Sequence, residues 1–295
     1  MAVTAPVVRS RTAPPPRAQR SRSRASRRLL GSVVPALLLA GWATVSATGF
    51  ISASLLPGPW QVALSARDFF FGEQRATLAG VVAFDGAGWG HLGASLLRCA
   101  VSYGLAVLVG IGVGVALGLS RWVADLLESL VNALRAVPLY AWLLLTLVWV
   151  GIGEDSARIL IFIGALWPVL IATADAVGRV PRGHVETARM LGTRRHRIWL
   201  RVHLPSALPE IVTGLRLGLT LAWMCVIVGE LTGTATGVGA MMNAAREIGR
   251  IDEILVGVLL FAVIGLLADT ALRAAARPWT RWSDRLAAAC GSTAW

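Results

Sequence analysis

The chain has 295 residues, of which 56% are hydrophobic and only 15% are charged, and it carries a formal net charge of +12. A soluble domain usually contains about 25% charged residues, so this composition indicates a membrane protein. All 28 basic residues are arginine. Without lysine the chain can form neither a phosphate-binding Gly-Lys-Ser/Thr loop nor a Schiff base, so any energy from a nucleotide must come through another subunit.

Six stretches are long and apolar enough to cross a bilayer as helices, which takes about 20 residues each. In chain order they are Leu29–Phe50, Ser95–Leu119, Val131–Ile152, Ala157–Val177, Ile211–Leu231 and Ile254–Leu272. The predicted fold class is therefore an all-α integral membrane protein with six transmembrane helices. We expect a disordered, arginine-rich cytoplasmic head at residues 1–28, a six-span domain at 29–272 and a cytoplasmic tail at 273–295.

The first span has a second interpretation. An arginine-rich start, an apolar run and the small residues Val45-Ser46-Ala47 also occur in cleavable signal peptides. The unusually long head and the spans that follow favour an uncleaved helix. We expect the head to fix orientation and to be attracted weakly to anionic lipid, and we do not expect it to bind nucleic acid.

Arginines alternate between the flanks of the spans, and positively charged flanks stay in the cytoplasm. Eight arginines and no acid precede the first span, and residues 179–201 hold seven arginines and one acid. In the loops at 51–94, 151–156 and 232–253, acids outnumber arginines. The pattern predicts that both termini and the 179–201 loop are cytoplasmic.

Gly110, Gly114 and Gly118 recur at every fourth position of the second span. They fall on one helix face and should let a neighbouring helix approach closely. The three cysteines and four histidines show no spacing typical of metal ligands, so we expect no metal or cofactor in this chain.

The loop at 179–209 is the most informative segment. It contains Gly183-His-Val-Glu186-Thr-Ala188-Arg-Met-Leu-Gly192 and, nine residues later, Val202-His-Leu204-Pro205. Glycine and proline at these positions predict two short helices that are separated at Gly192 and ended by Pro205 and Pro209. A short amphipathic helix between spans is typical of a segment that lies in a groove of another protein. On charge alone, a solvated basic turn that only fixes topology would explain the segment.

The spacing favours the first interpretation, because Glu186-Thr187-Ala188, Gly192 and Leu204-Pro205 resemble the E-A-A-x-x-x-G-x(11)-L-P signature of bacterial ABC importer permeases. Thr187 replaces the usual first alanine. Leu56-Pro57-Gly58-Pro59, Arg135-Ala136-Val137-Pro138 and Gly237-Val-Gly239 are similar to the subgroup that serves nitrate, sulfonate, taurine, bicarbonate and pyrimidine-type solutes.

The resemblance implies a type I importer in the bacterial plasma (inner) membrane. Two copies of the chain, as a homodimer, would form the path, and an extracytoplasmic binding protein would deliver the solute. Two cytoplasmic ABC ATPases would hold the ATP and Mg, so the chain itself would not be an enzyme and would hold no cofactor. Its ATPase-coupling residues would be Glu186, Thr187, Ala188, Gly192, Leu204 and Pro205.

Two other functions fit a membrane protein of this size. A proton-coupled secondary transporter needs ionisable residues buried in its spans, whereas Asp175, Glu230 and Asp269 lie near span ends, where we expect water to reach them. An intramembrane enzyme needs a nucleophile with a base, or paired carboxylates, at depth, and the sequence shows neither.

Arg216 and Glu230 are the candidate pathway residues. Arg216 lies five residues into the fifth span, where it offers a positive charge to an anion. Alternatively it only holds that end of the span. Arg98 is the weaker candidate of the two arginines near a span interior, and it is expected instead to extend outward to the membrane surface. The predicted solute is a small anion such as a sulfonate, taurine, nitrate or bicarbonate, and a pyrimidine-like or other non-anionic solute is the alternative.

Overall fold

The computed structural model describes residues 24–49, 51–52, 55–72, 86–180 and 182–291. The chain divides into two units, residues 1–51 and 52–295. The first unit contains one helix, α1 (Arg24–Ala47), which begins inside the predicted head; residues 1–23 of that head lie outside the described residues. From Val33 to Leu39 the large apolar side chains of α1 are exposed, as expected for a helix that faces lipid.

The regular structure described in the second unit is helical throughout. In chain order it consists of α2 (Pro59–Phe71), α3 (Gly88–Leu119), α4 (Arg121–Ala136), α5 (Leu139–Val150), α6 (Glu154–Gly178), α7 (Arg182–Met190), α8 (Arg195–Ile198), the π-helical segment η1 (Trp199–His203), α9 (Leu204–Leu231), α10 (Val238–Glu247) and α11 (Ile251–Gly291). Helix α2 forms within the predicted 51–94 loop, and α11 continues well beyond the predicted end of the last span.

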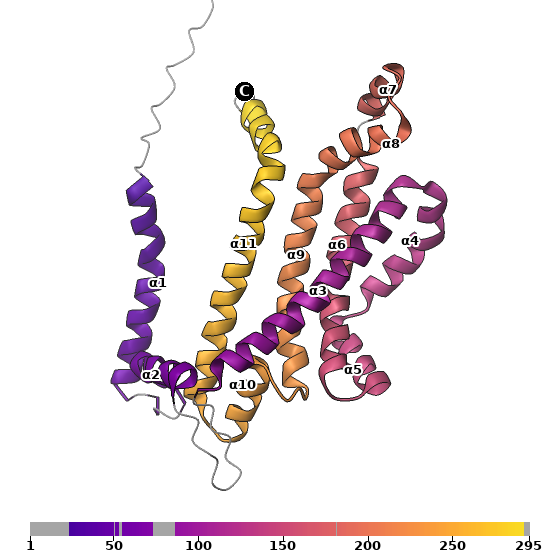
Figure 1. Cartoon of the computed structure of the whole chain (residues 1–295). Helices are drawn as coiled ribbons and strands as arrows, with labels where there is room; N and C mark the ends of the chain where they lie inside the picture. Colours follow the sequence, from indigo (N-terminus) through magenta and orange to yellow (C-terminus); the bar gives the residue numbers. More distant parts are fainter. Residues whose placement is uncertain (1–23, 50, 53–54, 73–85, 181, 292–295) are drawn as a thin grey trace, which may run out of the picture. The chain divides into compact units, whose positions relative to one another are not determined.

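Helix α6 packs along both α3 and α9 and forms the core of the second unit with them (Figure 1). The predicted glycine face of the second span lies against α6: a Cβ on Gly114 would be 2.6 Å from the carbonyl oxygen of Leu170. On the α9 side, a Cβ on Gly218 would be 2.7 Å from Val169 Cγ2. The close approach predicted from the glycine spacing is therefore confirmed, and α9 makes a second close approach to α6.

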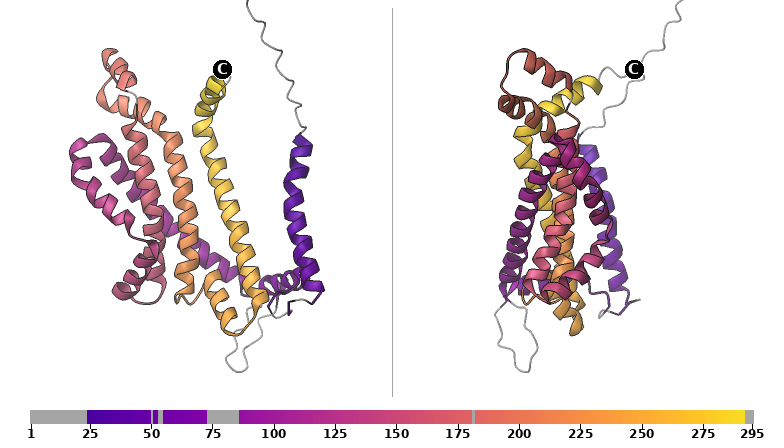
Figure 2. Two further views of the ribbon diagram at one scale, coloured as in Figure 1. Left: turned by 180° about the vertical axis from the view of Figure 1, so that it is seen from behind. Right: turned by 90° about the vertical axis from the view of Figure 1, so that its right-hand side faces the viewer.

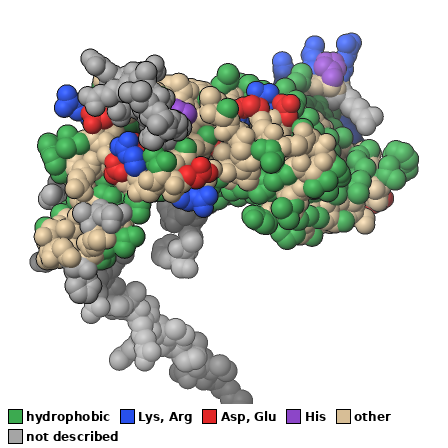
Figure 3. Space-filling view, turned by 90° about the horizontal axis from the view of Figure 1, so that it is seen from below, with side chains coloured by type: hydrophobic (Ala, Val, Ile, Leu, Met, Phe, Trp, Pro, Cys, Tyr) green, Lys and Arg blue, Asp and Glu red, His purple; other side chains and the backbone are tan. Residues whose placement is uncertain are grey.

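The second unit has two distinct ends. One end carries α7, α8 and the C-terminal part of α11, and the opposite end carries α2, α10 and the turn between α5 and α6 (Figure 2). We call them the loop end and the α10 end. Hydrophobic side chains cover much of the surface seen from the α10 end (Figure 3). Exposed apolar area on this scale indicates contact with lipid or with another protein.

The prediction of six continuous spans is wrong at the third. Four helices of the described residues are long and apolar enough to span a membrane: α3, α6, α11 and α9 together with the segment before it. The predicted span Val131–Ile152 is instead α4 and α5, which meet at a bend of 92°. Pro138 cannot donate a backbone hydrogen bond and drives the residue before it out of the helical conformation; Val137 is accordingly extended, with φ −68° and ψ 123°.

The prolines after the loop do not end a helix, contrary to the prediction. Segment η1 leads directly into α9, and Pro205 occupies one of the first two positions of that helix. The N–H of Leu204 still donates to the carbonyl of Trp199, so the helical backbone continues through Pro205, which itself lacks a backbone donor. The helical stretch of the fifth span therefore begins before Pro205, at His196.

Candidate functional site

The predicted coupling segment folds as α7, a tight turn and α8. Gly192 has φ +71°, a conformation that glycine adopts at little cost. The N–H of Thr193 donates to the carbonyl of Ala188 at 3.1 Å, and the N–H of Gly192 donates to that of Arg189 at 2.9 Å. These are the two hydrogen bonds of a Schellman helix end. The turn predicted at Gly192 is therefore confirmed.

The turn leaves the apolar side chains before it in solvent. Met190 is 87% exposed and Leu191 is 78% exposed, while Glu186 and Thr187 are exposed on the same helix. Adjacent exposed apolar side chains mark an interaction surface. Met190 and Leu191 are not among the residues predicted from the sequence. An apolar pair directly before a turn glycine is the signal that could have identified them.

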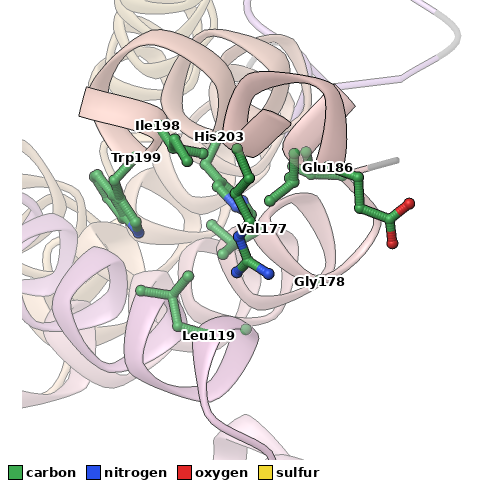
Figure 4. A pocket seen from close by; sticks show the side chains of 11 residues that line it. Leu119, Val177, Gly178, Glu186, Ile198, Trp199 and His203 are labelled. Carbon is green, nitrogen blue, oxygen red and sulfur yellow. The ribbon is translucent and has the colours of Figure 1, made fainter. Parts of the chain in front are cut away.

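A pocket of about 520 Å³ separates the loop from the ends of α3 and α6. Leu119 and Val177 line it from the helix ends, and Trp199 and His203 line it from the loop (Figure 4). The carboxylate of Glu186 points away from these side chains. The loop thus stands off the core and presents one of its predicted coupling residues outward.

The two helices that flank the loop are packed together where the chain leaves α6 and enters α9. Ala176 and Val177 of α6 form a buried cluster with Ala207 and Ile211 of α9. Arg179 follows α6 and donates hydrogen bonds to Asp175 at 3.2 Å and Glu210 at 3.0 Å. The loop therefore leaves and re-enters the core at two helix ends that are fixed to each other. Leu204 and Pro205, the remaining predicted coupling residues, are half-buried at the start of α9.

A buried charge cluster lies at the α10 end of the same three helices. Arg98 of α3 is 3% exposed and Glu230 of α9 is 1% exposed, and the two form an ion pair. Arg98 also donates to both carboxylate oxygens of Glu154, at 2.9 and 2.5 Å, and to the carbonyl of Thr236 at 3.0 Å. Bidentate contacts between arginine and a carboxylate are among the stronger and more directional hydrogen bonds in proteins.

Glu230 is enclosed by the turn before α10. Its carboxylate accepts hydrogen bonds from the hydroxyl of Ser95 at 2.6 Å and from the N–H of Gly239 at 2.7 Å. A Cβ on Gly237, which has φ +131°, would lie 2.5 Å from Oε1 of this carboxylate. Only glycine fits between the backbone and Glu230 at this point, so the turn and the buried charge depend on each other.

Two expectations from the sequence are wrong at this cluster. Arg98 does not extend outward, because its guanidinium lies within the helix bundle against two carboxylates. Water does not reach Glu230 in the folded chain, although Glu230 lies one residue from the end of α9. The turn and α10 fold back over that helix end and cover it, which a position count along the span could not show.

Arg216 lies on the side of α9 that faces α11. Its Nε donates to Asp269 at 2.9 Å, and Asp269 also pairs with Arg273. This pairing accounts for an arginine inside a span. The role of Arg216 in a solute path stays a prediction.

Comparison with known proteins gives a consistent result. The model of the family described as "Binding-protein-dependent transport system inner membrane component" matches residues 106–280. The taurine transport system permease protein TauC of Escherichia coli (strain K12) is 38% identical over 248 residues, which cover 84% of this chain and 87% of TauC. The putative aliphatic sulfonates transport permease protein SsuC of Bacillus subtilis (strain 168) is 32% identical over 254 residues, which cover 86% of this chain and 87% of SsuC.

A solved structure is similar as well. It shows inward facing conformations of the MetNI methionine ABC transporter, and it matches with a TM-score of 0.58 and 24% identity over 65% of this chain and 95% of that chain. At this level of identity the match shows a common fold.

Proposed function

The chain belongs to the family of binding-protein-dependent transport system inner membrane components, and we propose that two copies of it form the membrane path of an ATP-driven importer. Two cytoplasmic ATPase subunits dock on the α7–α8 loops, and an extracytoplasmic binding protein delivers solute at the α10 end. The chain hydrolyses nothing itself. The observation that carries the proposal is the loop, which exposes Met190 and Leu191 and connects α6 to α9 where these two helices pack together.

Each residue of the signature has a physical role in this proposal. Glu186 and Thr187 face outward from α7 toward the ATPase, and Gly192 makes the turn that presents Met190 and Leu191. Ala188 supplies the carbonyl that closes that turn. At the start of α9, Leu204 and Pro205 carry the movement of the loop into the fifth span.

The proposed orientation places the loop end in the cytoplasm. The arginine distribution favours it, and the second unit offers independent support, because α7 and the C-terminal part of α11 lie at the same end (Figure 1). Both termini are then cytoplasmic in the bacterial inner membrane, and α2, α10 and the α5–α6 turn face the binding protein.

The proposed solute is a small sulfonate. The support is the similarity to permeases named for taurine and for aliphatic sulfonates, each over more than four fifths of this chain. A proton-coupled transporter is the second candidate, since Glu230 proves to be buried. Glu230 is paired with Arg98, however. The neighbouring positive charge favours the ionised carboxylate, so this acid is poorly suited to take up and release protons.

Replacement of Gly192 tests the ATPase contact. Gly192→Val forces a β-branched residue to φ +71°, whereas Gly183→Val adds the same side chain within α7; a Cβ meets no atom within 4 Å at either site. Only the first change should disrupt the loop. We expect Gly192→Val to lower both ATPase copurification and ATP-dependent taurine uptake in proteoliposomes at least tenfold, with Gly183→Val close to wild type. Equal behaviour of the two variants would contradict the docking role.

The energy source can be tested on the same vesicles. Uptake by the complete complex should require ATP inside the vesicles and continue when the proton gradient is collapsed at constant ATP. Uptake that stops with the gradient would favour the secondary transporter instead.

A further inference from the structure

Helix α4 has a polar face that the described part of the chain leaves uncovered. At 100° per residue, its polar side chains gather on one face: Arg121, Asp125, Glu128, Ser129, Asn132 and Arg135. A neighbouring face carries Trp122, Leu126 and Leu130, which are 75%, 62% and 54% exposed. None of the α4 residues is buried. The apolar face suits lipid, and the polar face does not.

The polar face borders a cavity of about 430 Å³ between α4 and α6. Glu128, Asn132 and Arg135 line it from α4, and Asp175 lines it from α6. Arg179 already holds Asp175, at 3.2 Å. Among the described residues, the other three have neither a hydrogen bond nor an ion pair through their side chains. One carboxylate, one amide and one guanidinium are therefore available to a ligand.

The position in the fold indicates a solute path. The cavity lies toward the loop end of α3 and α6, because Gly118 and Gly178 line both this cavity and the pocket beside the loop. Helices α4 and α5 form the broken span, and interrupted helices in a membrane are tolerated where they line a cavity. The volume of the cavity is within the range of small-molecule sites. Arg216, in contrast, is engaged by Asp269.

The two charged side chains available in the cavity, Glu128 and Arg135, have opposite signs. This pairing of charges determines the class of solute. A simple anion at Arg135 would also meet the carboxylate of Glu128. The two residues are seven apart, about 10.5 Å along the helix at 1.5 Å per residue, and their long side chains can close on a small molecule from both sides. The fork of an arginine matches the oxygens of an acidic group, and a carboxylate accepts hydrogen bonds from an ammonium group.

We propose that the solute is a zwitterion with one ammonium and one sulfonate group, and that it binds on the polar face of α4. This proposal rests on the proposed import of sulfonates. Arg135 holds the sulfonate, Glu128 holds the ammonium, and Asn132 lies between them. The site selects solutes that carry a positive and a negative group at its two ends. A single arginine would bind any small anion and could not make this selection.

The transport test uses taurine and ethanesulfonate, which lacks the ammonium group, with the complete complex in proteoliposomes. Glu128→Gln should lower taurine uptake at least tenfold and leave ethanesulfonate uptake unchanged, whereas Arg135→Gln should lower both. Arg121→Gln is the matched control, because Arg121 lies on the same helix but outside the cavity; it should keep both. Copurification of the ATPase verifies assembly of each variant.

A binding test does not depend on delivery of the solute. Asn132→Cys and Arg121→Cys, each in a chain with Cys290→Ser, are labelled with a maleimide in the absence of the binding protein; the native Cys99 and Cys225 are buried. Taurine should slow labelling at position 132 several-fold and leave position 121 unaffected. Adding Glu128→Gln should abolish the protection.

The outcomes separate this proposal from the proposed function. If wild type imports sulfonates with ATP but Glu128→Gln lowers taurine and ethanesulfonate uptake equally, the zwitterion assignment is wrong. If neither variant changes uptake and taurine does not protect position 132, the path does not follow α4, and the proposed function still stands. A wild-type complex that imports neither solute with ATP would refute the proposed function, and labelling at position 132 would still decide whether the cavity binds taurine.

Discussion

The two ends of the α3–α6–α9 core are built in contrasting ways. At the α10 end, charged groups are buried and held by hydrogen bonds, and the turn beside them contains glycine where no larger residue fits. At the loop end, apolar side chains are exposed and a pocket separates the loop from the helices. The charge cluster at the first end is complete within one chain, whereas the exposed side chains at the second end offer surface that another protein can bury.

This contrast separates stability from coupling. Mutations at the α10 end should change how well the chain folds, because a buried charge without its partner is costly. Mutations at the exposed tip of the loop should change the contact with the ATPase and leave folding alone.

Arg98→Met should have the largest effect and test the α10 end directly. It leaves the carboxylate of Glu230 buried without its guanidinium, and breaking a buried pair in this way costs about 3 to 5 kcal/mol. The melting temperature in detergent and the yield of monodisperse protein measure the loss. Arg158→Met, which removes an arginine whose side chain is 51% exposed, should cost less than about 1 kcal/mol.

A double variant sharpens this result. Arg98→Met with Glu230→Gln removes both charges, and it should be more stable than Arg98→Met alone, because no uncompensated charge stays buried. A double variant as unstable as the single one would show that packing of the arginine, rather than its charge, holds this end together.

Gly237→Ala should rank second. The added Cβ meets the carboxylate of Glu230 at φ +131°, and a backbone that is nearly exclusive to glycine costs about 3 kcal/mol with another residue. Gly249→Ala is the matched control. It also has a positive φ, +76°, but meets no atom within 4 Å, so we expect about 1 kcal/mol. Equal melting temperatures would show that the turn does not enclose Glu230 as tightly as described.

Met190→Ser combined with Leu191→Ser tests the other side of the comparison. The melting temperature should not change, since both side chains are exposed. The affinity for the ATPase should fall about tenfold, which corresponds to about 1.4 kcal/mol. Titration of the ATPase onto the permease in detergent measures the change. A stability loss with unchanged affinity would reverse the assignment of the two ends.

Arg179→Gln should have the smallest effect. Its ion pairs with Asp175 and Glu210 are largely exposed, and such pairs contribute about 0 to 1 kcal/mol. The melting temperature should change little. A large loss would show that the ion pairs, rather than the apolar cluster of Ala176, Val177, Ala207 and Ile211, hold α6 and α9 together at the loop end.

The sequence predicted the family, the all-α membrane fold and the turn at Gly192, because each rests on local spacing. The match of the family model and the similarity to the MetNI structure confirm the type I ABC permease fold. The broken third span was missed, since its hydrophobic run continues through Pro138 and composition alone does not reveal a bend.

The cluster of Arg98 and Glu230 was beyond sequence reasoning for a different reason. Its members come from three helices and a turn that are distant in the chain, and a charge near a span end appears to be open to water until α10 is placed over it. The exposure of Met190 and Leu191 likewise depends on how far the Schellman turn lifts the loop from the core.

The glycine contacts on both sides of α6 have a mechanical consequence. Because α3 and α9 each pack their backbones closely against α6, the three helices form a stiff block whose members cannot slide without steric overlap. Both attachments of the α7–α8 loop are in that block. A partner that displaces the loop should therefore move α3, α6 and α9 together as one rigid group. Helix α4 buries no residue against its neighbours. When the block of α3, α6 and α9 moves, it should therefore move relative to α4.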